Sequence, residues 1–412
     1  MIDRLFRRES GQAVATLIRV LGDFDSAEDA VQDAFAVALE RWPDEGVPRN
    51  PAAWITRVSR NAAIDRLRRD RTLANKRLIL EGLARLEPPA EDSPQMSWER
   101  EPYPDDRLRL IFTCCHPAIA PESRVALTLR TLGGLSTAEI AHAFLSSESA
   151  MAQRLVRTKR KIRDAGIRYE VPDRRQMAGR LPSVTATLYL IYNEGYLGTS
   201  SDELLREELG AEAIRLTGLL AAMLPEESEV IGLLALMMLT HSRRRARVGP
   251  DGELVLLSDQ DRSLWDADEI RRGLALARRA AAAGQNAGPA GPYTVQAAIA
   301  AEHAKAATAA DWPRIARLYL WLAEFDPSPV VELNRAVAVA EAEGPEVGLE
   351  IIGSIDGLDG YQPLHVARAD LLSRTGDEPG AATAYRRALE LSSNPVQRSF
   401  IEQRLAGLEP GQ

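Results

Sequence analysis

Helical spacing of apolar residues runs through nearly the whole chain of 412 residues and leaves little room for other secondary structure. Gly133 and Gly134 stand where one helical stretch ends, Pro43 ends another, and Pro51 follows Asn50 as a first-turn proline follows an N-cap. The helical stretches are 10–20, 26–41, 51–70, 105–113, 122–132, 137–144, 148–165 and a long series over 175–405. The pattern predicts an all-α protein.

Charged residues are segregated along the first 170 positions, although the net charge of the whole chain, −8, alone argues against nucleic-acid binding. Residues 22–45 hold eight acidic residues against one arginine, and residues 49–77 hold nine basic residues against two acidic ones. Residues 81–106 are acidic again, eight to two, and residues 151–168 are basic, seven to one. This alternation predicts several different partners rather than one uniform surface.

Proline content divides the chain into modules. The stretch EPPAEDSPQMSWEREPYP holds five prolines and many acids, so it cannot sustain a helix and buries little apolar surface. In the stretch RVGPDGELVLL, a Pro-Asp-Gly turn precedes an alternating apolar run and predicts a small β-hairpin. The expected divisions are a helical module at 1–78, an acidic linker at 79–104, a second helical module at 105–168, a helical extension at 175–290 and helical repeats at 291–412.

A repeat appears near the C-terminal end of the sequence. Three small or apolar positions recur at an offset of 33 residues: Ala336 and Ala369, Gly348 and Ala381, and Ile352 and Tyr385. Small residues at these places let paired helices touch, and the spacing is close to the tetratricopeptide period of about 34. The pattern predicts a tetratricopeptide-like unit, and the alternative is an ordinary helical hairpin.

The second basic block, in LGGLSTAEIAHAFLSSESAMAQRLVRTKRKIR, has the layout of a helix-turn-helix. Ile140 and Ala141 face inward on a short first helix, and Met151 and Leu155 do so on a longer second helix. The opposite face of the second helix carries Ser149, Gln153, Arg154, Arg157, Lys159 and Arg160. Such a helix can lie in the major groove of duplex DNA, with its basic side chains on bases and phosphates. The alternative is a solvated basic helix in a bundle.

The first basic block is NPAAWITRVSRNAAIDRLRRDR. Arg57, Asn61 and Arg68 share one helical face, and Trp54 lies at its border. An aromatic ring beside arginine and asparagine suits unstacked single-stranded bases. It suits equally a tryptophan that is half-buried in a helical bundle.

Three stretches in this order resemble the extracytoplasmic-function group of bacterial RNA polymerase sigma factors. They are AEDAVQDAFAVALERWP, NPAAWITRVSRNAAIDRLRR and GLSTAEIAHAFLSSESAMAQRLVRTKRKIR. In that family the acidic helix docks on the clamp coiled coil of core RNA polymerase. The basic segment after it grips the −10 promoter element as a separated strand, and the helix-turn-helix reads the −35 element as duplex.

The resemblance implies roles for particular residues. Contacts with core polymerase fall on Asp29, Gln32, Asp33 and Phe35. Contacts with the −10 element fall on Trp54, Arg57, Asn61, Arg68 and Arg69. The polar face of the second helix of the helix-turn-helix, Ser149 to Arg160 as given above, would contact the −35 element. The alternative for Phe35 is that it belongs to the core.

The remainder of the chain resembles a sigma subgroup with a long helical C-terminal extension. The matching stretches include LYLIYNEGY, DQDRSLWD, GPYTVQAAIAAEHA and PSPVVELNRAVAVAEAEG. In that subgroup the extension, with tetratricopeptide-like repeats, acts on the factor's own activity, which implies an intramolecular contact between extension and sigma modules. The resemblance implies a factor that directs core RNA polymerase to specific promoters.

Other classes fit less well. A conventional helix-turn-helix regulator would bind duplex DNA without polymerase, but it would not need the acidic first helix or the Trp54 face. No phosphate loop, paired-histidine metal motif or nucleophile elbow occurs, so we expect no enzyme and no cofactor. Adjacent Cys114 and Cys115 cannot form a disulfide framework and, with His116, lack the usual zinc spacing. We expect them to pack structurally, the alternative being a redox or metal role.

The sequence also predicts where the protein resides. The first ten residues lack an apolar core of signal-peptide length, and the longest apolar run, residues 230–239, is too short to span a bilayer. Two adjacent cysteines fit a reducing compartment. We therefore expect a cytoplasmic protein with no membrane contact.

Overall fold

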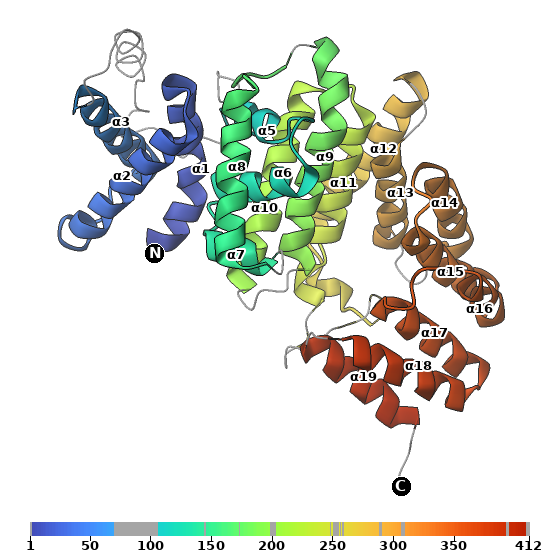
Figure 1. Ribbon diagram of the computed structural model, residues 1–412. Helices are drawn as coiled ribbons and strands as arrows, with labels where there is room; N and C mark the ends of the chain where they lie inside the picture. Colours follow the sequence, from blue (N-terminus) through green and yellow to red (C-terminus); the bar gives the residue numbers. More distant parts are fainter. Residues whose placement is uncertain are drawn as a thin grey trace. The chain divides into compact units, whose positions relative to one another are not determined.

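A computed structural model shows an all-α architecture in the part of the chain that it describes (Figure 1). The described residues are 2–69, 106–143, 146–172, 174–197, 203–247, 249, 255, 257, 259–287, 291–305, 310–392 and 395–408. They divide into two compact units, residues 1–220 and residues 221–412. Within these ranges no helix combines the length and apolarity that a bilayer crossing requires.

The first unit begins with a bundle of three helices, α1 (Ile2–Leu21), α2 (Phe24–Glu45) and α3 (Pro51–Arg69). Asp23 caps α2 by accepting a hydrogen bond from the Ser26 amide at 2.8 Å. The predicted cap at Asn50 is confirmed, since its side chain accepts a hydrogen bond from the Ala53 amide at 3.1 Å. The predicted end of α2 at Pro43 is wrong: the helix continues to Glu45, because a proline in the last turn removes only one backbone hydrogen bond.

The second part of this unit holds the helix-turn-helix. Four helices form it: α5 (Asp106–Cys114), α6 (Pro121–Thr131), α7 (Thr137–Ala143) and α8 (Glu148–Asp164). Ile140, Ala141, Met151 and Leu155 are all buried, as the helical spacing predicts. Ser147 caps α8 by accepting a hydrogen bond from the Ala150 amide at 3.3 Å. These contacts fix the direction of α8 and therefore which of its side chains reach solvent.

Two further helices complete the first unit, α9 (Arg174–Leu197) and α10 (Glu203–Met223), of which the residues up to Leu220 belong to this unit. Arg124 on α6 donates a hydrogen bond to Ser183 on α9 at 2.9 Å. Arg107 on α5 forms a salt bridge with Glu212 on α10 at 3.5 Å. The beginning of the predicted extension is thus structurally joined to the helix-turn-helix module.

The second unit starts from a helix that is buried on all sides, α11 (Ser228–His241). Residues 230–239 are buried without interruption, which explains why this apolar run has no polar face. Two helices pack against it, α12 (Ala267–Ala287) and α13 (Pro292–Lys305). Glu229 caps α13 by accepting hydrogen bonds from the amides of Tyr293 at 2.9 Å and Thr294 at 3.0 Å.

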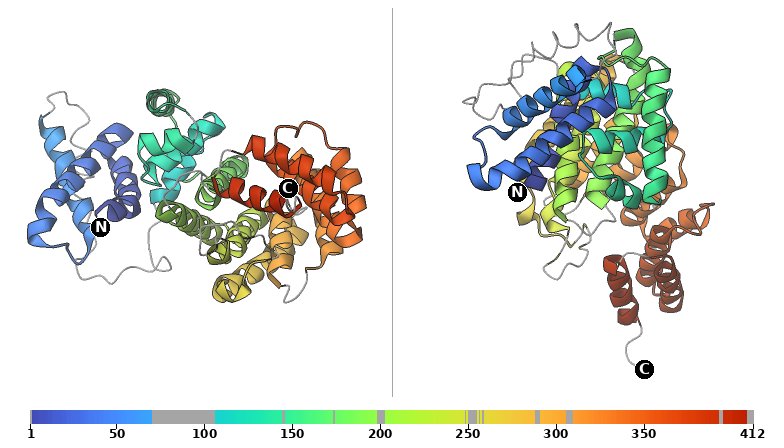
Figure 2. Two further views of the ribbon diagram at one scale, coloured as in Figure 1. Left: turned by 90° about the horizontal axis from the view of Figure 1, so that it is seen from below. Right: turned by 60° about the vertical axis from the view of Figure 1, so that its left-hand side comes forward.

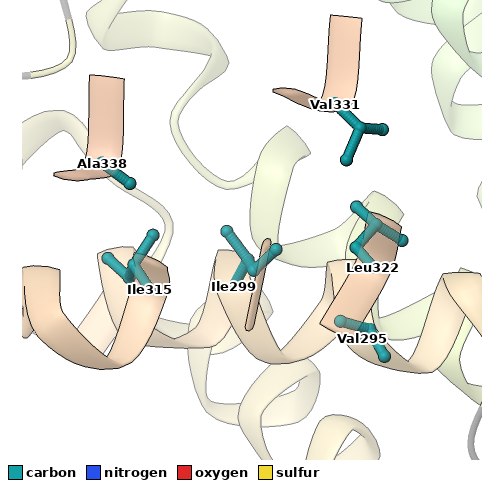
Figure 3. Close-up of a cluster of buried hydrophobic side chains, with 6 residues drawn as sticks. All are labelled: Val295, Ile299, Ile315, Leu322, Val331 and Ala338. Atoms are coloured by element: carbon teal, nitrogen blue, oxygen red, sulfur yellow. The ribbon is translucent and has the colours of Figure 1, made fainter. Parts of the chain in front are cut away.

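The remaining helices follow one another as antiparallel neighbours (Figures 1 and 2). They are α14 (Trp312–Phe325), α15 (Pro329–Glu343), α16 (Pro345–Gly353), α17 (Gln362–Thr375), α18 (Glu378–Leu391) and α19 (Pro395–Leu408). Figure 3 shows the core that joins α13, α14 and α15, built from Val295, Ile299, Ile315, Leu322, Val331 and Ala338. Each helix pair thus buries its apolar stripe against the next, as in repeat proteins.

The predicted offset of 33 residues is confirmed by the helix starts. Helix α15 starts at Pro329 and α17 at Gln362, while α16 starts at Pro345 and α18 at Glu378. Gly348 shows why small residues recur, because a Cβ atom there would lie 2.5 Å from the Ala340 Cβ. The two pairs are repeats of one helical hairpin, as the tetratricopeptide-like pattern predicts.

The predicted β-hairpin is not supported, because the described residues contain no strand. The Val255 amide donates a hydrogen bond to the Arg247 carbonyl oxygen at 2.9 Å, but neither residue belongs to a strand. The turn itself, residues 250–254, lies outside the described residues. A single cross-connection is too little to define a two-stranded ladder.

Candidate nucleic-acid interface

An acidic surface covers the outer face of α2. Asp29 and Asp33 are exposed, and Arg66 of α3 donates hydrogen bonds to both, at 2.8 Å and 2.7 Å. Gln32 is exposed between them. Phe35 is only 4% exposed and lies in the core of the bundle, so a partner cannot reach it in this conformation. The reachable part of the predicted polymerase surface is therefore polar.

On α3, the predicted −10 residues differ in exposure. Asn61 is exposed, whereas Trp54 and Arg57 are half-buried. The Trp54 ring meets the buried Trp42 ring edge-on, with 5.2 Å between centroids, so it packs within the bundle as the structural alternative for this residue proposes. Arg68 and Arg69 belong to α3, but their side chains lie outside the described residues.

The outer face of α8 presents a compact polar and basic surface. Four of the predicted −35 residues are exposed there: Ser149, Gln153, Arg157 and Arg160. Arg157 donates a hydrogen bond to the Gln153 side chain at 3.1 Å, and Arg160 lies 3.4 Å from Asp164. At 100° per residue, Ser149, Gln153 and Arg160 fall within one 40° arc, with Arg157 beside it. We call these four residues the α8 face.

The other two predicted −35 residues are engaged within the protein. Arg154 forms a salt bridge with Glu122 of α6 at 3.2 Å. Lys159 places its Nζ atom 3.0 Å from Asp25 Oδ1 and 2.8 Å from Glu28 Oε2, both on α2. Only 12% of the Lys159 side chain is exposed. It lies at the edge of the helix next to the core, where it meets another module rather than solvent.

Sequence reasoning missed three participants in these surfaces, Arg66, Asp25 and Glu28. The local charge count includes all three, but a count gives no partner for any of them. Lys159 and Glu28 are 131 positions apart, so nothing in the local pattern of either helix indicates that they meet.

The two cysteines lie deep inside the module that holds the helix-turn-helix. Neither is exposed, and their sulfur atoms lie 3.7 Å from Thr131 Oγ1 and 3.9 Å from Thr128 Oγ1, respectively. Burial raises the pKa of the Cys115 thiol to about 11, and it raises the pKa of Cys114 as well. Both sulfurs thus stay protonated in the interior, which suits packing rather than redox chemistry.

We expect neither thiol to react with an aromatic disulfide reagent in the native protein at pH 8, because reaction needs an exposed thiolate. Unfolding in guanidinium chloride should release both thiols of the chain to the reagent. The absorbance of the released thiolate measures the count before and after unfolding. Rapid labelling of the native protein would contradict the buried position.

Comparisons with known proteins agree with the order of these modules. Residues 5–72 match sigma-70 region 2, and residues 109–162 match sigma-70 region 4. Residues 180–281 match a family of unknown function, DUF6596. The chain is 42% identical over 399 residues to an uncharacterized protein of Rhizobium meliloti (strain 1021), covering 96% of this chain and 92% of that one. No solved structure matches.

The matched regions coincide with the surfaces described above. Region 2 contains the acidic surface of α2 and the basic helix α3, and region 4 contains nearly all of the helix-turn-helix. Regions 2 and 4 together serve promoter recognition by RNA polymerase, so the partners of this chain are core polymerase and promoter DNA. The chain therefore belongs to the sigma-70 family of RNA polymerase sigma factors, as an extracytoplasmic-function member that carries a DUF6596 extension.

Proposed function

We propose that the acidic surface of α2 docks on the clamp coiled coil of core polymerase, that α3 holds the −10 strand and that the α8 face reads the −35 duplex. The observation that carries this proposal is the exposure of the α8 face on a helix whose opposite side is locked into the core. Exposed arginines beside an exposed amide are the donors and acceptors that duplex bases and phosphates require.

The proposed polymerase contact rests on Asp29, Gln32 and Asp33. Each aspartate already binds Arg66, so a basic surface of polymerase would replace or share that arginine. Phe35 supports the helix from the core and leaves the proposed contact. Acidic side chains in this position steer a basic partner and set its orientation.

Reconstitution with core RNA polymerase tests the assignment. The full chain should co-purify with core polymerase and should allow transcription from a promoter selected from a random-sequence library, whereas the chain alone should give no stable promoter complex. A conventional regulator would do the opposite, since it would protect a palindromic duplex without polymerase. That second result would overturn the proposed function.

We propose further that the second unit regulates the activity of the factor through contact with its sigma modules. The subgroup resemblance supports this, together with the lack of a basic surface there comparable with that of α8. Helices α9 and α10 are excluded from the proposed regulatory part, because Ser183 and Glu212 bind side chains of α6 and α5.

Truncation tests the regulatory proposal. A chain of residues 1–224 keeps α10 whole and is expected to change transcript yield in the reconstituted reaction while selecting the same promoter sequence. A chain of residues 1–173 removes the partners of Arg124 and Arg107 and should lose thermal stability as well. A changed −35 preference in the 1–224 chain would contradict the proposal.

A further inference from the structure

One contact in the first unit joins the two modules that are proposed to act on DNA. Lys159 leaves the DNA-reading helix sideways and binds Asp25 and Glu28 in the first turns of α2, at 3.0 Å and 2.8 Å. Glu28 is itself only 13% exposed in its side chain, so the pair is shielded from water on both sides. Shielding makes such a contact stronger than an ordinary surface salt bridge.

The same two modules meet at a second place along α1. The hydroxyl of Tyr169 donates to the carbonyl oxygens of Ala15, at 2.8 Å, and Asp106, at 2.7 Å. At Gly11 the backbones approach so closely that a Cβ atom would lie 2.7 Å from the carbonyl oxygen of Leu132. The approach of α2 to α8 is therefore part of a packed interface.

The chemistry of the contact imitates DNA binding. A lysine ammonium group binds a phosphate as a point charge, and two carboxylate oxygens about 3 Å away offer it the same interaction. Their negative charges also lie beside α8, where they would repel the phosphates of an approaching duplex.

We propose that Asp25 and Glu28 take the place of a DNA phosphate on Lys159 and hold the two modules closed until core polymerase separates them. The inference rests on the proposed function of α8 and adds its regulation. Polymerase is the releasing partner because Asp25, Glu28, Asp29 and Asp33 follow one another on a single arc of α2, so a basic partner on Asp29 and Asp33 competes for the whole acidic arc.

Salt dependence of DNA binding tests the competition between carboxylates and phosphate. We would measure binding of the full chain to a 30-base-pair duplex of mixed sequence over a range of KCl concentrations. Asp25→Asn plus Glu28→Gln is expected to raise the affinity about fivefold. It should also steepen the logarithmic salt slope by about 0.9, because one more lysine becomes free to release a counterion.

A matched control and a cycle separate this effect from a change of net charge. Glu40→Gln plus Glu45→Gln removes the same charge from exposed positions of α2 that make no ion pair within the described residues, and it should leave the slope unchanged. Lys159→Ala should leave the slope of the otherwise unaltered chain unchanged but should cancel the increase in the Asp25→Asn, Glu28→Gln background. Equal slopes for the variant and the control would overturn the proposal.

Zero-length cross-linking tests the closed contact without using DNA. A carbodiimide should join Lys159 to Asp25 or Glu28 in the free full-length chain, and peptide mass spectrometry should identify the amide. Addition of core polymerase should bring its yield down to background. A missing cross-link in the free chain, or an undiminished one in the complex, would overturn the proposed lock even if DNA binding by α8 holds.

A variant at the second contact opens the interface without altering a charge. Gly11→Ala should clash with Leu132, lower the yield of the Lys159 cross-link and steepen the salt slope as the double carboxylate variant does. Gly179→Ala on α9 is the control, since a Cβ atom there meets nothing within 4 Å. A Gly11→Ala chain that keeps the cross-link and the slope of the parent would contradict the closed interface.

Discussion

Replacing Arg157 and Arg160 together by alanine is expected to lower promoter affinity of the polymerase complex about 100-fold, with about tenfold from each lost contact. Both arginines are exposed on the α8 face, and neither takes part in the core of the helix-turn-helix. Affinity for core polymerase should stay the same, because the proposed docking surface lies on α2. Filter binding of a fluorescent promoter and co-purification with core polymerase measure the two properties.

The control for this experiment removes two arginines elsewhere. Arg272→Ala plus Arg278→Ala alters exposed residues of α12 in the second unit and should change neither property. If the α12 pair lost promoter affinity as strongly, general charge rather than the α8 face would explain the loss. If the α8 pair lost polymerase binding, the division of roles between α2 and α8 would be wrong.

Replacing Gly232 by alanine is expected to destabilise the second unit by about 2–3 kcal/mol, at the upper end of overpacking costs. The new Cβ atom would lie 2.8 Å from both the N and the Cα atoms of Thr294, and backbone atoms cannot turn away as a side chain can. Moving Thr294 would also disturb its hydrogen bonds to Glu229, which cap α13. Urea unfolding followed by tryptophan fluorescence measures the change in the free energy of unfolding.

Gly353→Ala provides the comparison on α16. Its Cβ atom meets nothing within 4 Å and the residue is exposed, so alanine should be neutral or stabilise the helix by up to about 1 kcal/mol. Equal stability of the two variants would mean that α11 and α13 do not approach each other as described.

Features that depend on neighbours in sequence were predictable. Helical spacing placed Ile140 and Met151 in the core, the Asn50 cap followed from its position before Pro51, and the repeat followed from small residues 33 positions apart. Each depends on a period or a local hydrogen bond that the sequence carries directly.

Features that depend on distant partners were not. The basic face of α8 was assigned as a whole, but Lys159 points to α2, because its position at the edge of the buried stripe brings it against Asp25 and Glu28. Phe35 was taken as a surface residue by family position, although it shares the buried stripe of α2 with Val31 and Trp42. Its burial was open to helical reasoning, whereas the partners of Lys159 required the tertiary structure.

The DUF6596 match, residues 180–281, does not coincide with a structural boundary. It supplies α9 and most of α10 to the first compact unit and α11 and α12 to the second. A chimera of two related factors that is joined near residue 170 would pair α5 and α6 with a foreign α9. A joint between α10 and α11, at residues 224–227, would leave each unit with its native interior, so swapping of regulatory units among paralogues has a natural seam inside this family rather than at its edge.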